Sequence, residues 1–256
     1  MGKKQIRFLE NIAANGFVAL EETYYDGWEL RFTQGFTGRA NSVQIREEST
    51  IEPEQKVEYC EKAYAEHDLP CMFKLTDADR DFISFLENRG YQAIKPTDVM
   101  TLVLNDTNMG YDAREVLDGV KFSTTPDDWF EPYFEFDNYQ DNKSRELIRK
   151  IHAKVTVDQI YIMVMFKEKV AAVASLAIEN GYSLLHNVVV SPELRGNGLG
   201  KKLCQAAILK SKECGASYIY LQVMQNNPIA LDLYRKLGFE KQYTYYYVVK
   251  QVQRKV

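Results

Sequence analysis

The segment with the clearest chemistry is a glycine-rich loop, RGNGLG, at residues 195–200. It follows the β-branched run VVV and a Ser-Pro pair, and it precedes a predicted helix that runs to about Lys212. Such a loop exposes backbone N–H groups at a helix N-terminus, where the helix dipole favours an anion such as a pyrophosphate. We therefore expect a phosphate-bearing cofactor to bind Arg195, Gly196, Asn197, Gly198, Leu199 and Gly200.

The spacing of the loop excludes two common phosphate motifs. A P-loop frame ending at Lys201 requires glycine at position 195, and the dinucleotide fingerprint requires glycine at position 201. A turn that only caps the helix is the structural alternative, above all for Gly196 and Asn197.

A second pattern, NPIALDLYRKLGF, begins at Asn227 and places a phenol at Tyr234. The loop fits the R-x-x-G-x-G/A signature of the GNAT acyltransferase superfamily, and the second pattern resembles that family's N-x-x-A-x-x-L-Y-x-x-x-G-F. Together with the strands before them, the two patterns cover the C-terminal half of the chain. The resemblance implies a GNAT fold and an N-acetyltransferase that moves an acetyl group from acetyl-CoA directly to a primary amine.

The resemblance also implies a role for each matching residue. Three residues would pair through their backbone with the pantetheine arm, and one of their N–H groups would polarise the thioester carbonyl: Val188, Val189 and Val190. Asn227 would bond to the cofactor where two strands part, and Tyr234 would protonate the departing thiolate. The alternative for Tyr234 is a core tyrosine, because its helix carries an apolar stripe.

The base that deprotonates the amine is less defined. His186 lies two residues before Val188, so strand alternation predicts that the two share a face. A structural histidine fits the pattern equally well. A cationic acceptor would suit the acidic, aromatic stretch at 127–141, although a solvated helix face explains it too; the acids there are Asp127, Asp128, Glu131, Glu135, Asp137 and Asp141.

The order of predicted elements favours an α/β (α+β) fold, with a mixed, mostly antiparallel sheet flanked by helices. Sliding the chain by 148 residues lays FLENRGY over LYRKLGF and the strand CMFKL near IYLQV. We therefore predict two tandem GNAT-like domains, 1–108 and 116–256, joined by a polar linker at 105–112. The acidic run EESTIE falls where the loop should be, so the first domain would be degenerate.

Composition limits the remaining possibilities. A net charge of −4 argues against general nucleic-acid binding, and the three histidines show no metal-ligand spacing. With no signal peptide, no membrane span and four cysteines expected to be buried free thiols, we expect a cytoplasmic monomer or homodimer. Two alternatives stay open: a non-catalytic acyl-CoA-binding sensor or docking module, and an aminoacyl-tRNA-dependent ligase.

Overall fold

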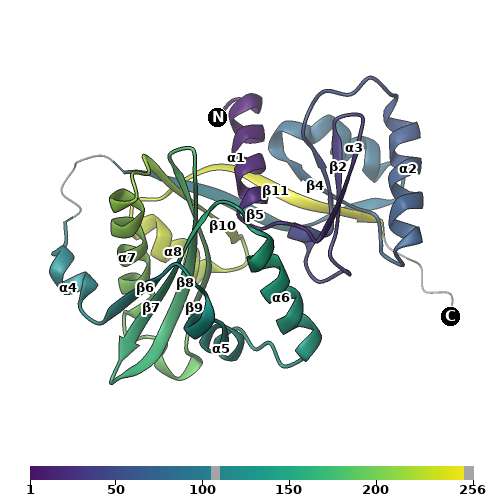
Figure 1. Cartoon of the computed structure of the whole chain (residues 1–256). Coiled ribbons are helices and arrows are strands. Elements are labelled where there is room, and N and C mark those ends of the chain that lie inside the picture. The colour runs from purple at the N-terminus through teal and green to yellow at the C-terminus, as the bar shows by residue number, and fades with distance from the viewer. Residues whose placement is uncertain (105–109, 251–256) are drawn as a thin grey trace.

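The computed structural model describes residues 1–104 and 110–250, so most of the predicted linker at 105–112 lies outside the described residues. The described residues form one eleven-stranded sheet with the strand order β1-β2-β3-β4-β11-β5-β10-β9-β8-β7-β6 (Figure 1). The predicted class is confirmed, because helices flank a mixed sheet whose neighbouring strands are mainly antiparallel. Parallel pairing occurs between β3 and β4 and between β9 and β10.

The N-terminal half contains helices α1 (Lys3–Asn15), α2 (Pro53–Glu66) and α3 (Arg80–Glu87), and strands β1 (Glu21–Tyr25), β2 (Trp28–Phe32), β3 (Val43–Ile45), β4 (Met72–Thr76) and β5 (Tyr91–Val103). The predicted elements occur in order. Strand β1 was not predicted, because four of its five residues are exposed and its sequence, EETYY, lacks an apolar alternation.

The C-terminal half contains helices α4 (Ala113–Leu117), α5 (Asp127–Phe136), α6 (Asn142–Lys154), α7 (Leu199–Glu213) and α8 (Pro228–Lys236), and strands β6 (Val120–Ser123), β7 (Asp158–Phe166), β8 (Lys169–Glu179), β9 (Tyr182–Val190), β10 (Tyr218–Met224) and β11 (Glu240–Lys250). Helices α5 and α6 pack beside β8 and β9 in Figure 1, while α7 covers the opposite face of these strands.

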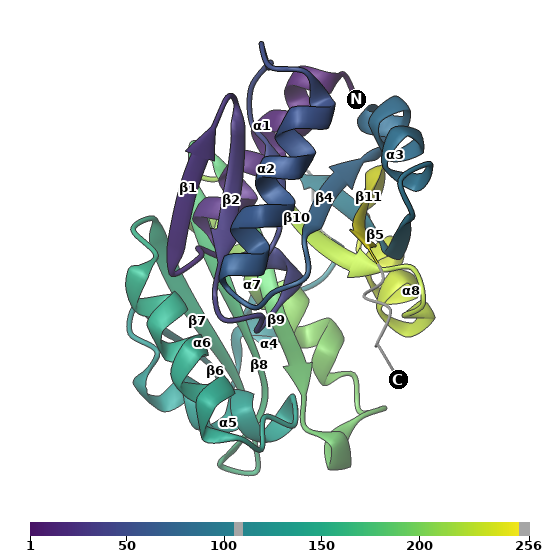
Figure 2. The same ribbon diagram turned by 90° about the vertical axis from the view of Figure 1, so that its right-hand side faces the viewer.

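The two halves exchange their last strands. Strand β11 pairs with β4 of the N-terminal half, and β5 pairs with β10 of the C-terminal half. The exchanged strands also pair with each other and run side by side through the middle of the molecule (Figures 1 and 2). Val248 of β11 is fully buried in the N-terminal core, and Met100 of β5 is buried in the C-terminal core. Each half therefore completes the sheet and core of the other.

The internal similarity extends to local geometry. In both halves a helix, a strand, a second helix and a long strand follow one another: α2-β4-α3-β5 and α7-β10-α8-β11. Gly90 and Gly238, which the 148-residue slide superimposes, end the second helix with φ of +83° and +90°. A left-handed residue after a helix favours glycine, so this match has a physical reason. The division into domains 1–108 and 116–256 stays a prediction.

Helix α1 is fastened to the sheet by a buried ion pair. Glu10 on α1 lies 2.6 Å from Lys74 Nζ on β4, and it accepts a 2.7 Å hydrogen bond from the Tyr243 hydroxyl on β11. Burial opposes ionisation of Glu10, but the Lys74 charge prevails and lowers its pKa. Tyr243 and Tyr245 are buried on this side of β11 in the cluster around α1.

Two sequence expectations concern properties of the whole chain. All four cysteines are free, and Cys60, Cys71 and Cys204 are buried as expected; Cys214 is exposed, because it follows the last turn of α7. Among the described residues, no helix combines the length and apolar composition that crossing a bilayer requires.

Candidate active site

The strands β9 and β10 separate at the centre of the C-terminal half. Their parallel pairing runs from Tyr182 and Tyr218 to Leu185 and Leu221, and then stops. Beyond that point β9 continues to Val190 paired with β8, while β10 continues to Met224 paired with β5. The β9 edge at 188–190 therefore has no strand partner on the β10 side among the described residues. An extended ligand could pair with this edge as an added strand.

A bulge interrupts β9 at Asn187, which has a left-handed φ of +55°. Ser175 pairs with His186, but Val173 pairs with Val189, so β9 carries one extra residue here. The expectation that His186 and Val188 share a face is therefore wrong. Val189 packs with α5, whereas Val188 and Val190 pack on the α7 side. His186 lies on the side of Val189, with its ring 6.3 Å from that of His152 on α6.

The loop at 195–200 has the backbone of an anion site. Gly196 and Gly198 have left-handed φ of +83° and +75°, which favour glycine, and a Cβ on either would meet no atom within 4 Å, so the backbone conformation rather than crowding selects glycine there. Gly198 is the N-cap of α7, and the N–H groups of residues 199–201 donate to no backbone carbonyl of the described chain. These donors and the helix dipole favour a bound anion.

The side chains of the loop divide into two kinds. Asn197 donates through Nδ2 to the Leu194 carbonyl at 3.1 Å, which fits the turn-residue interpretation. Arg195 is exposed and makes no ion pair within the described part of the chain, so its charge is available to a ligand. Gly200 lies against the end of β9 and α8, since a Cβ there would be 3.5 Å from Val190 Cγ2 and 3.7 Å from Leu233 Cδ2. The fold thus brings together the loop, the free β9 edge and α8.

Tyr234 and Asn227 occupy α8. The Tyr234 ring is buried against Phe239, and burial raises the pKa of its phenol. Its hydroxyl bonds to no described residue and is not fully enclosed, although the residue as a whole is only 7% exposed. Asn227 caps α8 by accepting from Ala230 N at 3.2 Å, which leaves its Nδ2 group free to donate. Both residues keep a polar group available for a ligand.

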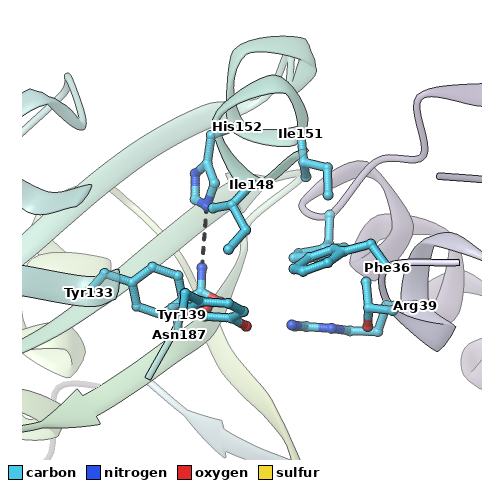
Figure 3. A pocket seen from close by; sticks show the side chains of 10 residues that line it. Phe36, Arg39, Tyr133, Tyr139, Ile148, Ile151, His152 and Asn187 are labelled. Carbon is cyan, nitrogen blue, oxygen red and sulfur yellow. Dashed lines mark hydrogen bonds between the residues drawn. The ribbon is translucent and has the colours of Figure 1, made fainter. Parts of the chain in front are cut away.

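A cavity of about 160 Å³ lies on the other side of the β9 bulge (Figure 3). It is enclosed between the N-terminal half and helices α5 and α6; its lining is Phe17, Phe36, Thr37, Arg39, Tyr133, Tyr139, Ile148, Ile151, His152 and Asn187. Asn187 contributes to the cavity wall and immediately precedes the free edge of β9. The cavity and the gap between β9 and β10 therefore meet at this residue.

The cavity floor is a polar network that sequence reasoning missed. Asn187 Nδ2 donates to Ser175 Oγ at 3.0 Å and lies 3.5 Å from His152 Nε2, as Figure 3 draws for the second contact. His152 Nδ1 lies 3.0 Å from the Tyr161 hydroxyl. Burial, with a smaller contribution from the Arg39 charge, lowers the pKa of His152 from 6.5 to about 4. His152 is therefore neutral at pH 7.

His186 lies beside this network without joining it. Both of its ring nitrogens are enclosed and without a partner, and burial lowers its pKa well below 6.5. It does not line the cavity, whereas His152 does. Helix α6 therefore brings a second histidine, His152, to this region, which the sequence did not indicate.

The acidic stretch forms an exposed helix face. Five of its carboxylates point to solvent, with Glu131 paired to Arg145 and Arg149, while its aromatic residues are buried. The exception is Asp137, whose carboxyl hydrogen-bonds to Tyr139 and Tyr133 beside the cavity and whose pKa burial raises. This outcome is the solvated-face alternative, and none of the six acids lines the cavity. Within the described ranges, no cluster of His, Cys, Asp and Glu could hold a metal ion.

Comparisons with known proteins agree with this geometry. The chain is 26% identical over 249 residues to the uncharacterized N-acetyltransferase YobR of Bacillus subtilis, covering 96% of this chain and 99% of that protein. A GCN5-related N-acetyltransferase from Kribbella flavida has the same fold, with a TM-score of 0.69, 15% identity and coverage of 97% and 96%.

A tandem GNAT protein from the clavulanic acid biosynthesis pathway matches 81% of this chain and 74% of its own, with a TM-score of 0.60 and 15% identity. The family model described as "Probable histone acetyltransferase Rv0428c C-terminal" matches residues 3–248, nearly the whole chain. The chain therefore belongs to this family and is an acetyltransferase of the GNAT superfamily.

Proposed function

We propose that this chain transfers an acetyl group from acetyl-CoA to the primary amine of a small acceptor that enters the cavity. The observation that carries the proposal is the position of Asn187. This residue lines the cavity and immediately precedes the unpaired edge of β9 at residues 188–190. A thioester held along the edge would face an amine held in the cavity, the arrangement that direct transfer needs.

The proposed donor site uses the residues predicted from the sequence. The pantetheine arm would pair with the backbone of residues 188–190, whose N–H groups would polarise the thioester carbonyl. The pyrophosphate would lie at the loop 195–200, and the free amide of Asn227 would bond to the cofactor. Tyr234 would give its proton to the thiolate. Burial raises the pKa of its phenol and so weakens it as an acid, which means that the transfer requires a thiolate that the site has also desolvated.

The proton of the amine needs a separate route. The unpartnered ring of His186 supports it as the base, but its lowered pKa and its position outside the cavity lining oppose that role. His186→Gln removes the titrating group, so loss of the acid limb of the kcat/KM profile would support the base role. An unchanged pH profile of kcat/KM would mean that His186 has only a structural role and that the acceptor binds as the neutral amine.

The proposal is tested by acetyl transfer itself. The purified chain is incubated with acetyl-CoA and a panel of primary amines, thiol release is followed, and mass spectrometry identifies the acetylated product. We expect amine-dependent thiol release that Gly198→Glu abolishes. Tight acetyl-CoA binding without turnover of any amine would favour the non-catalytic sensor instead.

A further inference from the structure

Arg39 brings a positive charge from the N-terminal half into the cavity. It belongs to a 3-10 turn (Gly38–Ala40) between β2 and β3, and its guanidinium points toward Tyr139 and Asn187 (Figure 3). Its Cζ lies 3.9 Å from the centroid of the Phe17 ring, which holds the group in place at the cavity wall.

The charge of Arg39 has no counter-charge in contact. Arg39 forms no ion pair with any residue in 1–104 or 110–250, and none of the ten lining residues is an aspartate or glutamate. The Arg39 charge acts at longer range on the carboxyl of Asp137, whose pKa it lowers slightly against the effect of burial. Asp137 does not line the cavity and lies beyond ion-pair distance of Arg39. A half-buried guanidinium without a partner is unfavourable, and its planar fork of donors matches a carboxylate or a phosphate.

The rest of the cavity indicates what the ligand would carry besides an anion. Phe17, Phe36, Ile148 and Ile151 supply apolar walls. The opposite end is Asn187, next to the edge where the acetyl group would lie. A ligand that spans the cavity would therefore place one end at Arg39 and the other at the β9 bulge.

We propose that the acceptor is a small amine that also bears an anionic group, a carboxylate or a phosphate, which Arg39 binds. This inference rests on the proposed function and replaces the cationic acceptor that the sequence suggested. It also gives the N-terminal half a role, because that half supplies the residue that selects the substrate.

Matched ligand pairs test the inference by calorimetry in the presence of saturating CoA. The pairs are L-phenylalanine with L-phenylalaninamide, and O-phosphoethanolamine with ethanolamine, so each pair differs at its anionic group. A charge-assisted contact should make the anionic member of at least one pair bind about 10-fold or more tightly than its partner. A preference in the phenylalanine pair would identify the anionic group as a carboxylate, and a preference in the ethanolamine pair would identify it as a phosphate.

Variants assign the preference to Arg39. Arg39→Gln should abolish the difference within the pair, while Arg39→Lys, which keeps the charge, should retain part of it. Arg80→Gln is the control, since it removes a charge from a side chain that is 80% exposed on α3, and it should keep the full difference. Thermal denaturation checks that each variant is folded.

Two results would overturn the inference: no anionic preference in the unaltered protein for either pair, or a full preference that survives Arg39→Gln. Acetyl-CoA affinity is titrated separately in the same protein. Failure to bind acetyl-CoA contradicts the proposed function, whereas acetyl-CoA binding without an anionic preference contradicts only the inference about Arg39.

Discussion

Replacing Tyr234 by phenylalanine separates its proposed catalytic role from its role in the core. The variant keeps the ring and its edge contact with Phe239, whose centroid lies 5.8 Å away. The hydroxyl makes no hydrogen bond with a described residue, so its removal breaks no internal bond. We therefore expect the free energy of unfolding to change by no more than about 0.5 kcal/mol.

The same change should reduce turnover strongly. A positioned general acid contributes roughly 10²–10⁴-fold to the rate, which corresponds to about 3–5 kcal/mol in the barrier. Tyr234→Phe should lower kcat by that factor and leave the Kd of acetyl-CoA within about twofold, because the hydroxyl acts mainly in the transition state. Thiol release measures kcat, and calorimetry measures the Kd.

Tyr220→Phe is the matched control. Tyr220 is also buried, but it faces α1 rather than the site, so its hydroxyl should not affect kcat. If kcat of Tyr234→Phe stays within twofold of the unaltered protein, Tyr234 is a core residue. An equal loss in the control would mean that the assay reports packing instead of proton transfer.

Three further predictions concern the fold. Glu10→Gln leaves Lys74 buried without its partner and should cost about 3–5 kcal/mol in urea denaturation, a loss that a purely exposed pair would not show. His152 has a pKa of about 4 in the folded chain and 6.5 in the unfolded chain, so the unfolded chain binds more protons below pH 7. Acidification from pH 7 to 5 should therefore lower the free energy of unfolding of the unaltered protein by about 2 kcal/mol more than that of His152→Gln. Equal losses in the two proteins would contradict the lowered pKa of His152. Because the halves exchange strands, we expect a single unfolding transition by calorimetry and no cooperative folding of fragments 1–108 or 116–256 alone; two separated transitions would contradict this expectation.

The local features of the candidate site could be predicted from the sequence. Left-handed backbone favours glycine at Gly196 and Gly198, at the start of one helix, and Asn227 caps the next helix. These positions depend on neighbours within a few residues, so their signal lies in short patterns.

The remaining features depend on contacts between distant segments. The bulge at Asn187 adds one residue to a strand without a glycine or proline to mark it, and so the face of His186 was wrongly predicted. Arg39 reaches the cavity from a turn almost 150 residues before Asn187. The exchange of β5 and β11 follows from pairing across the whole sheet. Strand propensity says that a strand forms but not which strand it will join.

Titration of acetyl-CoA into the whole chain tests the central claim most directly, because the claim places the cofactor at the loop 195–200. We predict one acetyl-CoA per unaltered chain and no measurable binding to Gly198→Glu, whose carboxylate would oppose the pyrophosphate. Gly90→Glu is the control, since Gly90 has a similar φ of +83° and equally open surroundings, and it should bind normally. Undiminished affinity in folded Gly198→Glu, or two acetyl-CoA molecules per chain, would contradict the account.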